Sequence, residues 1–204
     1  MLSPSTVGDR SERELIARIR ALLPPSPAWM LVGIGDDAAV VEPERNRVEV
    51  LTVDAIVEGI HFDRAFVPPD AIGHRALAVN LSDLAAMGAA PRLALLSMAL
   101  PTGLPLADFD AIADGFASLA ALHRLHVVGG NLTRSPGPLM IDVTVMGTVK
   151  RRQALTRGGA RWRRPLRQRH GRNGTRRVAA APVISRQSSV LSPQSYRGGS
   201  DGRD

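Results

Sequence analysis

The chain has 204 residues, with 26 basic and 19 acidic side chains, no cysteine and 3% aromatic residues. The absence of cysteine excludes disulfides, a thiolate nucleophile and cysteine-ligated metal centres. No apolar run approaches the roughly 18 residues that a membrane span requires. The mixed charges of residues 1–20 do not resemble a signal peptide. These features indicate a cytoplasmic protein with an aliphatic core.

The formal net charge of +7 conceals two regions of opposite sign. Residues 1–150 contain 12 basic and 17 acidic side chains, whereas residues 151–204 contain 14 arginines and two aspartates. From Arg161 onward, the arginines show no apolar period and stand among Ser, Gln, Gly and Pro. Such a composition cannot build a packed core. We therefore expect an acidic, ordered domain over residues 1–160 and a disordered, arginine-rich tail over residues 161–204.

Apolar periodicity predicts both helices and strands in the acidic domain. The first helix is expected to begin at Ser11, because Ser11 and Glu14 have the spacing of a capping box. Asp70 is expected to cap the second helix. The predicted helices span residues 11–22, 70–87 and 105–125, the predicted strands span 38–42, 48–53, 93–100 and 139–149, and loops are expected over 54–69 and 129–138. This order lacks a strict βαβ repeat and predicts an α+β fold, a mixed sheet with two long helices packed on one face.

Several carboxylates are expected where these elements begin or end. Asp37 lies in a turn after Gly35, Asp54 follows the strand that ends at Val53, and Asp83 lies on the second helix. Oxygen ligands of this kind suit Mg²⁺ that is held between carboxylates and phosphate groups. A structural interpretation stays open at this point, since the three residues are equally compatible with a turn, a strand end and a solvated helix face.

A histidine and a glycine pair are further candidates for contacts with an anion. His61 follows Gly59 in the long loop and is suited to contact an anionic group or carry a proton, or is simply exposed. The Gly129-Gly130 pair is able to present backbone N–H groups to phosphate. It is not a P-loop, because the Gly-Lys-Ser/Thr ending is missing.

Taken together, these segments closely resemble the thiamine-monophosphate kinase family, which belongs to the superfamily of aminoimidazole-ribonucleotide synthetase and selenophosphate synthetase. The segments occur in the family's order and comprise GIGDDAAV at 33–40, TVDAIVEGIHF at 52–62, ALAVNLSDLAAMGAAP at 76–91 and the Gly129-Gly130 turn. The resemblance covers about residues 10–161. It implies the fold of the amino-terminal domain of that superfamily, and a homodimer built through this domain.

The resemblance also implies an activity, which is the ATP-dependent phosphorylation of thiamine monophosphate to thiamine diphosphate with Mg²⁺ as cofactor. The residues that match the family's motifs are Asp37, Thr52, Asp54 and Asp83 as Mg²⁺ ligands, His61 as a contact to thiamine monophosphate, and Gly130, Asn131 and Arg157 as contacts to ATP. Asn131 departs from the pattern, because the family has Asp there. Asn keeps a carbonyl oxygen but loses a charge, so we expect a weaker metal contact.

A second departure begins near residue 161, where the family continues into a whole second domain. Residues 162–178, back-translated with permitted codons and shifted by one nucleotide, can be read as the family's continuation. We therefore interpret residues 162–204 as a frameshifted translation, which the coding DNA would test. We expect little or no kinase activity from the chain as it stands.

Two other interpretations remain at this stage. One is another ATP-dependent member of the superfamily, such as a selenophosphate-synthetase-like protein, although the chain lacks cysteine and a lysine-rich amino-terminal loop. The other is a non-catalytic fragment whose tail binds nucleic acid in a salt-sensitive way. The tail contains one Trp and one Tyr and no recognisable binding fold. Nucleic acid and membranes are therefore not the expected partners.

Overall fold

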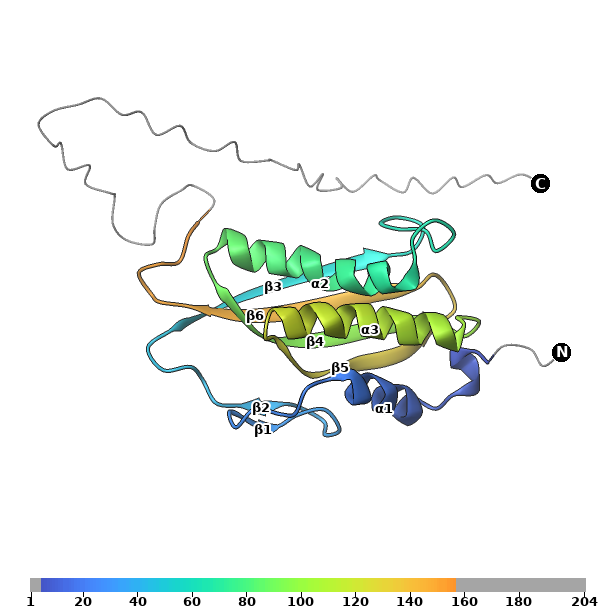
Figure 1. Ribbon diagram of the computed structural model, residues 1–204, viewed down its shortest axis with the longest axis horizontal. Helices are drawn as coiled ribbons and strands as arrows, with labels where there is room; N and C mark the ends of the chain where they lie inside the picture. The colour runs from blue at the N-terminus through green and yellow to red at the C-terminus, as the bar shows by residue number, and fades with distance from the viewer. Residues whose placement is uncertain (1–4, 157–204) are drawn as a thin grey trace, which may run out of the picture. The chain divides into compact units, whose positions relative to one another are not determined.

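The computed structural model describes residues 5–156, and Arg157 and the expected tail lie outside these residues (Figure 1). The elements in chain order are the 3₁₀ helix η1 (Val7–Asp9), α1 (Glu12–Leu22), β1 (Met30–Val32), β2 (Val40–Val41), β3 (Val48–Val57), α2 (Pro69–Ala86), β4 (Ala90–Pro101), α3 (Leu106–Leu122), β5 (His126–Ser135) and β6 (Met140–Val149). In this part of the chain, none of the helices combines the length and apolar character needed to cross a membrane.

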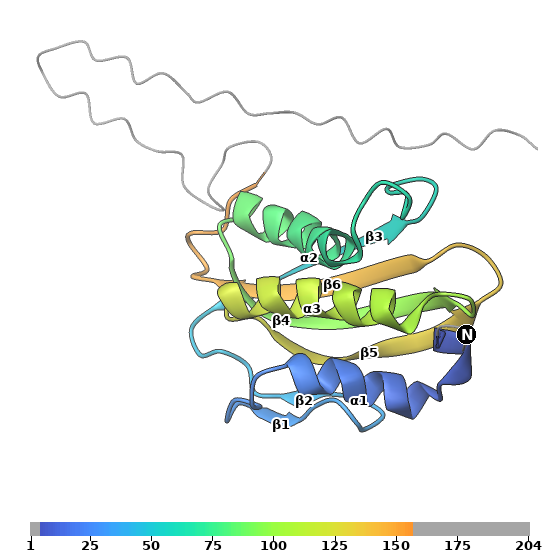
Figure 2. The same ribbon diagram turned by 45° about the vertical axis from the view of Figure 1, so that its right-hand side comes forward.

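Four strands form one mixed sheet in the order β3-β6-β4-β5. β6 is antiparallel to both β3 and β4, whereas β4 and β5 are parallel. β1 and β2 form a separate two-stranded sheet. Helices α2 and α3 lie side by side over one face of the four-stranded sheet (Figures 1 and 2). The predicted α+β fold, with a mixed sheet and two long helices on one face, is confirmed.

The core lies between the sheet and these two helices. Along β6, alternate residues Ile141, Val143 and Val145 are fully buried, as expected where one strand face points into a core. The other face of the sheet points away from α2 and α3, and we call it the open face. It carries Leu51, Val53 and Leu95, which are 62%, 60% and 41% exposed.

The predicted first helix and its capping box are present. The Glu14 backbone N–H donates to Ser11 Oγ at 3.3 Å, and the Ser11 N–H donates to Glu14 Oε2 at 2.8 Å. α1 packs against α3 and β5, beside the sheet edge that β5 forms (Figure 2). An ion pair of 2.6 Å between Arg18 and Asp110 joins α1 to α3.

Three differences from the expectation concern the site residues or the helix that carries them. β3 continues through Val57, so Asp54 lies inside the strand, because β3 pairs with β6 along its whole length. The Gly129-Gly130 pair lies inside β5 and not in a loop, since β5 pairs with β4 on both sides of it. Pro68 occupies the N-cap of α2, and Asp70 stands in the first turn of that helix.

The expected strands 38–42 and 48–53 belong to different sheets. β2 pairs with β1, and the turn that follows it contains Asn46 in a left-handed conformation with φ of 62°. The chain then enters β3, which pairs with β6. The two-stranded sheet lies on the side of the four-stranded sheet that β5 borders (Figure 1).

Candidate functional site

The first group of predicted site residues lies at the β3 edge of the sheet. Thr52 and Asp54 are two positions apart on β3, so their side chains leave the strand on the same face. Asp83 reaches this face from α2, which packs against β3. The Thr52 hydroxyl donates a hydrogen bond of 3.0 Å to Asp83 Oδ2. We call Thr52, Asp54 and Asp83 the β3-edge group.

The carboxylates of this group repel each other. Burial raises the pKa of Asp54 above its ordinary value of 3.8, and the negative charges of Asp83 and Asp142 add to the rise. The electrostatic interaction with His61 acts in the opposite direction and lowers the pKa of Asp54. A cation placed among these oxygens would relieve the repulsion, which makes the group a candidate metal site.

His61 stands next to the β3-edge group, in the segment between β3 and α2. Its Nδ1 atom accepts a hydrogen bond of 3.0 Å from the Val57 backbone N–H. A ring nitrogen that accepts a hydrogen bond carries no proton, so the proton of the neutral ring is assigned to Nε2. The exposed side chain therefore offers an N–H donor to an anion.

The segment that carries His61 is held in place by three contacts of charged side chains. Arg75 of α2 donates a hydrogen bond of 2.6 Å to the His61 carbonyl oxygen. Arg64 forms a 2.7 Å ion pair with Glu58, and Glu58 also accepts a hydrogen bond from the Leu139 N–H at 3.2 Å. Sequence reasoning missed Arg75 and Glu58, because charged residues at a helix surface and beside a glycine carry no signal of such contacts.

The second group lines a cavity of about 270 Å³ at the opposite edge of the sheet, beside β5. Its polar lining comprises Glu12, Asp36, Asp37, Gly130 and Asn131, and its apolar lining includes Ile16, Ile19, Ile34 and Leu132. The Asp37 backbone N–H donates to Asp36 Oδ1 at 2.9 Å, which fixes the turn after Gly35. We call this cavity the glycine pocket.

Gly130 has no room for a side chain. A Cβ atom there would lie 1.8 Å from the Leu96 carbonyl oxygen of the neighbouring strand, and the residue has a φ of 156°. The absence of a side chain lets the backbone of β5 approach β4 closely and leaves this wall of the pocket as bare main chain. Bare main chain of this kind is accessible to phosphate oxygens.

The two groups are separated within one chain. β3 and β5 are the outer strands of the sheet, and three strand spacings of about 4.8 Å place them roughly 14 Å apart. Among residues 5–156, no three His, Asp or Glu side chains are close enough to hold one metal ion. The structure thus brings Thr52 next to Asp83 near Asp54, and places Asp37 and Asn131 in the lining of one cavity. Arg157 lies outside the described residues.

Comparison with known proteins shows the family of the chain. Residues 35–149 match the family described as AIR synthase related protein, N-terminal domain. The chain belongs to this family. The predicted resemblance to the amino-terminal part of the thiamine-monophosphate kinases is also confirmed by its relatives.

The thiamine-monophosphate kinase of Bacillus subtilis (strain 168) is 38% identical over 130 residues, which are 64% of this chain and 40% of that protein. The crystal structure of thiamine-monophosphate kinase from Stenotrophomonas maltophilia K279a has 46% identity and a TM-score of 0.61, and the match covers 71% of this chain and 44% of that one. A structure of AaThiL complexed with AMPPCP and TMP has 36% identity and a TM-score of 0.53 over 62% of this chain and 40% of that one. This AIR synthase family chain therefore spans less than half the length of the relatives it matches.

Proposed function

We propose that the chain supplies the metal- and nucleotide-binding part of an ATP-dependent thiamine-monophosphate kinase. The reaction would transfer the γ-phosphoryl group of ATP to thiamine monophosphate in the cytoplasm. Similarity to named thiamine-monophosphate kinases supports this activity, and so does AaThiL, which is complexed with AMPPCP and TMP. The observation that carries the proposal is the β3-edge group, where Thr52 binds Asp83 and the pKa of Asp54 is raised.

The β3-edge group fits Mg²⁺ by the chemistry of its donors. Two carboxylates and a hydroxyl are hard oxygen ligands, and the repulsion between the carboxylates is what a divalent cation would remove. Asp37 would add a further carboxylate from the glycine pocket. Bound Mg²⁺ would neutralise charge on the phosphate groups, which is the main requirement of phosphoryl transfer.

The remaining residues of the site would bind and orient the two substrates. His61 would donate its Nε2–H to the phosphate of thiamine monophosphate. The Val57 N–H holds the ring through Nδ1, and Arg75 holds the His61 backbone through its carbonyl oxygen. Gly130 would let ATP phosphates approach the β5 backbone, and Asn131 would offer an amide there. We keep Arg157 as a proposed contact to ATP.

A homodimer through the open face would unite the two groups. The exposed apolar side chains of Leu51, Val53 and Leu95 would be buried between two sheets. A twofold axis that runs along the strands places the β3 edge of one copy beside the β5 edge of its partner. The β3-edge group of one chain would then border the glycine pocket of the other chain, although they are far apart within one chain.

Binding of AMPPCP, which is not turned over, tests the site in the 204-residue chain. We expect Mg²⁺-dependent binding in calorimetry, and about tenfold weaker binding in Asp83→Asn, because a charged ligand of the cation is lost. Asp114→Asn removes the same charge from an exposed position of α3 and is the matched control. Equal affinities of the two variants, or binding that ignores Mg²⁺, would contradict the proposal.

Catalytic turnover by this chain is tested separately from binding. We expect little or no thiamine diphosphate from the 204-residue chain alone, because its match spans only 40% and 46% of two thiamine-monophosphate kinases. A coupled assay with ATP and thiamine monophosphate measures this. Product formed at ordinary enzyme rates would overturn the expectation of impairment and would strengthen the assignment of the activity.

A further inference from the structure

A second polar cavity, of about 450 Å³, shares no lining residue with the glycine pocket. It lies where β4 and β5 begin, next to the turn that follows β2. Its lining includes Trp29, Arg45, Arg47, Arg92, Arg124 and His126. These residues come from four separate segments of the chain, and none of them belongs to the candidate site described above. We call this cavity the arginine pocket.

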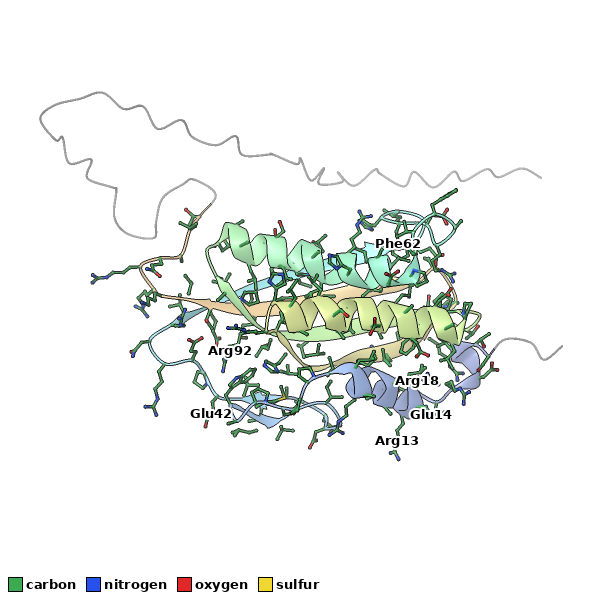
Figure 3. The ribbon with its side chains drawn as sticks, viewed as in Figure 1. Arg13, Glu14, Arg18, Glu42, Phe62 and Arg92 are labelled. Carbon is green, nitrogen blue, oxygen red and sulfur yellow. The ribbon has the colours of Figure 1, made fainter. Side chains whose placement is uncertain are left out.

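Arg92 contacts two other residues that line the pocket, Trp29 and Glu42. Its guanidinium carbon lies 4.4 Å from the centroid of the Trp29 ring, which is the geometry of a cation–π contact. Nη2 donates to the Glu42 carbonyl oxygen, whereas Nη1 is buried without a hydrogen-bond partner. Figure 3 shows Arg92 and Glu42 at the end of the domain that carries β1 and β2. A buried donor without a partner has a high cost unless a ligand accepts from it.

The positive charges of the pocket exceed the negative ones. Glu44 is occupied by an ion pair with Arg47 and by the Thr148 hydroxyl, which donates to it at 2.6 Å. Within residues 5–156, Arg45 and Arg124 have neither an ion pair nor a side-chain hydrogen bond.

The remaining charges of the pocket also favour an anion. Glu42 is the one carboxylate left to balance Arg45, Arg92 and Arg124 among the described lining residues. His126 packs edge-on against Trp29 at 5.4 Å, and burial lowers its pKa, so its ring adds no charge at neutral pH.

The backbone of Arg124 gives independent support. α2 and α3 end in the same way, with two N–H groups after the helix returning to carbonyls of its last turn. In α2 the residue at the left-handed position is Gly88, with φ of 70°, whereas in α3 it is Arg124, with φ of 52°. Glycine is strongly favoured at this position. The chain thus places an arginine beside the pocket at a position where its backbone is strained.

We propose that the arginine pocket binds a phosphoryl group, either as free phosphate or as the phosphate of a small organic molecule. Arg124 and Arg45 supply unpaired guanidinium groups, and Arg92 adds a third positive charge to the lining. Planar guanidinium groups match phosphate oxygens in two-bond geometry. An excess of two positive charges suits a dianion, and the volume lies in the range of small-molecule sites. The proposal is independent of the kinase activity.

Fluorescence of Trp29 tests this in the full chain. Trp162→Phe leaves Trp29 as the single tryptophan, so the signal reports on the pocket and not on the other arginines. We expect a saturable change on titration with inorganic phosphate or methyl phosphate, and none with sodium chloride at equal ionic strength. Tighter binding of methyl phosphate would indicate an organic ligand, whereas equal or weaker binding would indicate free phosphate.

Arg124→Gly provides the decisive variant, because it removes the guanidinium together with the rest of the side chain, and glycine suits the backbone there. We expect about tenfold weaker phosphate binding in this variant. Arg13→Ala, which removes the same charge from an exposed position of α1 that points away from the domain, is expected to stay within about twofold (Figure 3). A response that does not saturate, or equal affinities of Arg124→Gly and its parent, would overturn the proposal.

Discussion

The two outer strands of the sheet hold their candidate site residues by different means. At the β3 edge, charged side chains project from regular elements, and a hydrogen bond of 3.0 Å from Thr52 fixes Asp83. At the β5 edge, one wall of the glycine pocket is backbone, and Gly130 is held against the Leu96 carbonyl. The first edge therefore depends on charge, whereas the second depends on the space that a missing side chain leaves.

This difference predicts opposite sensitivities. An isosteric change at the β3 edge should leave the fold in place and alter electrostatics. A single methyl group added at Gly130 should instead disturb strand pairing, because main-chain atoms cannot move aside as a flexible side chain can. Substitutions at the two edges separate these effects.

The largest effect is expected for Gly130→Ala. Its Cβ would lie 1.8 Å from the Leu96 carbonyl oxygen, so β5 would have to move away from β4. We expect a loss of about 3 kcal/mol in the free energy of unfolding, measured by urea denaturation.

Gly129→Ala is the matched control for this change. The nearest atom to its Cβ would be Leu95 Cδ2 at 3.3 Å, at the end of a flexible side chain. We expect a loss below about 1 kcal/mol. Similar losses for the two variants would show that close approach of the strands is not what Gly130 provides.

The sequence predicted local features well. Ser11 and Glu14 identified the start of α1 because a capping box requires only residues three positions apart. The fold class followed from the order of apolar patterns. The extension of β3 to Val57 was missed. Residues 54–57 show no clear alternation of polar and apolar side chains, and the partner of Val57, Met140 on β6, lies far along the chain.

The arrangement of the site was harder to predict than its residue types. Glycine is a weak strand former, so Gly129-Gly130 suggested a turn, and only the pairing with β4 explains its place inside a strand. The resemblance to the kinase family implied that Asp37, Asp54 and Asp83 bind a cation, whereas their spacing alone left a structural role open. Neither showed that the strand order places Asp37 at one edge and the other two at the opposite edge. Residue roles in ligand binding stay predictions.

An intermediate effect is expected for Ser11→Ala. The change removes the side-chain acceptor of the Glu14 N–H, and loss of an N-cap costs about 1 kcal/mol. α1 carries Ile16 and Ile19 to the glycine pocket, so this substitution should loosen the β5 side alone. Hydrogen exchange should accelerate at α1 amides and stay unchanged at β3.

Ser26→Ala, in the exposed segment after α1, serves as the control, because Ser26 forms no side-chain hydrogen bond among residues 5–156. Faster exchange at β3 in Ser11→Ala would contradict the independence of the two edges.

The smallest effect is expected at Asp54, in the chain freed of metal by a chelator. Its pKa in the folded chain is raised above the ordinary 3.8, so the folded chain binds this proton more tightly than the unfolded chain does. The free energy of unfolding therefore decreases as the pH rises from 3.8 through the raised pKa, and the penalty is complete above it. Asp54→Asn should be slightly more stable than its parent at neutral pH, and this advantage should vanish below pH 3.8.

Urea denaturation across this pH range measures the difference, with Asp114→Asn as the variant that removes an exposed carboxylate elsewhere. An advantage of Asp54→Asn that persists below pH 3.8 would mean that packing, and not charge, separates it from its parent. The same denaturation experiment with added Mg²⁺ tests whether a cation binds at Asp54. A cation at the β3-edge group would stabilise the parent and not the variant, and would reverse their order at neutral pH.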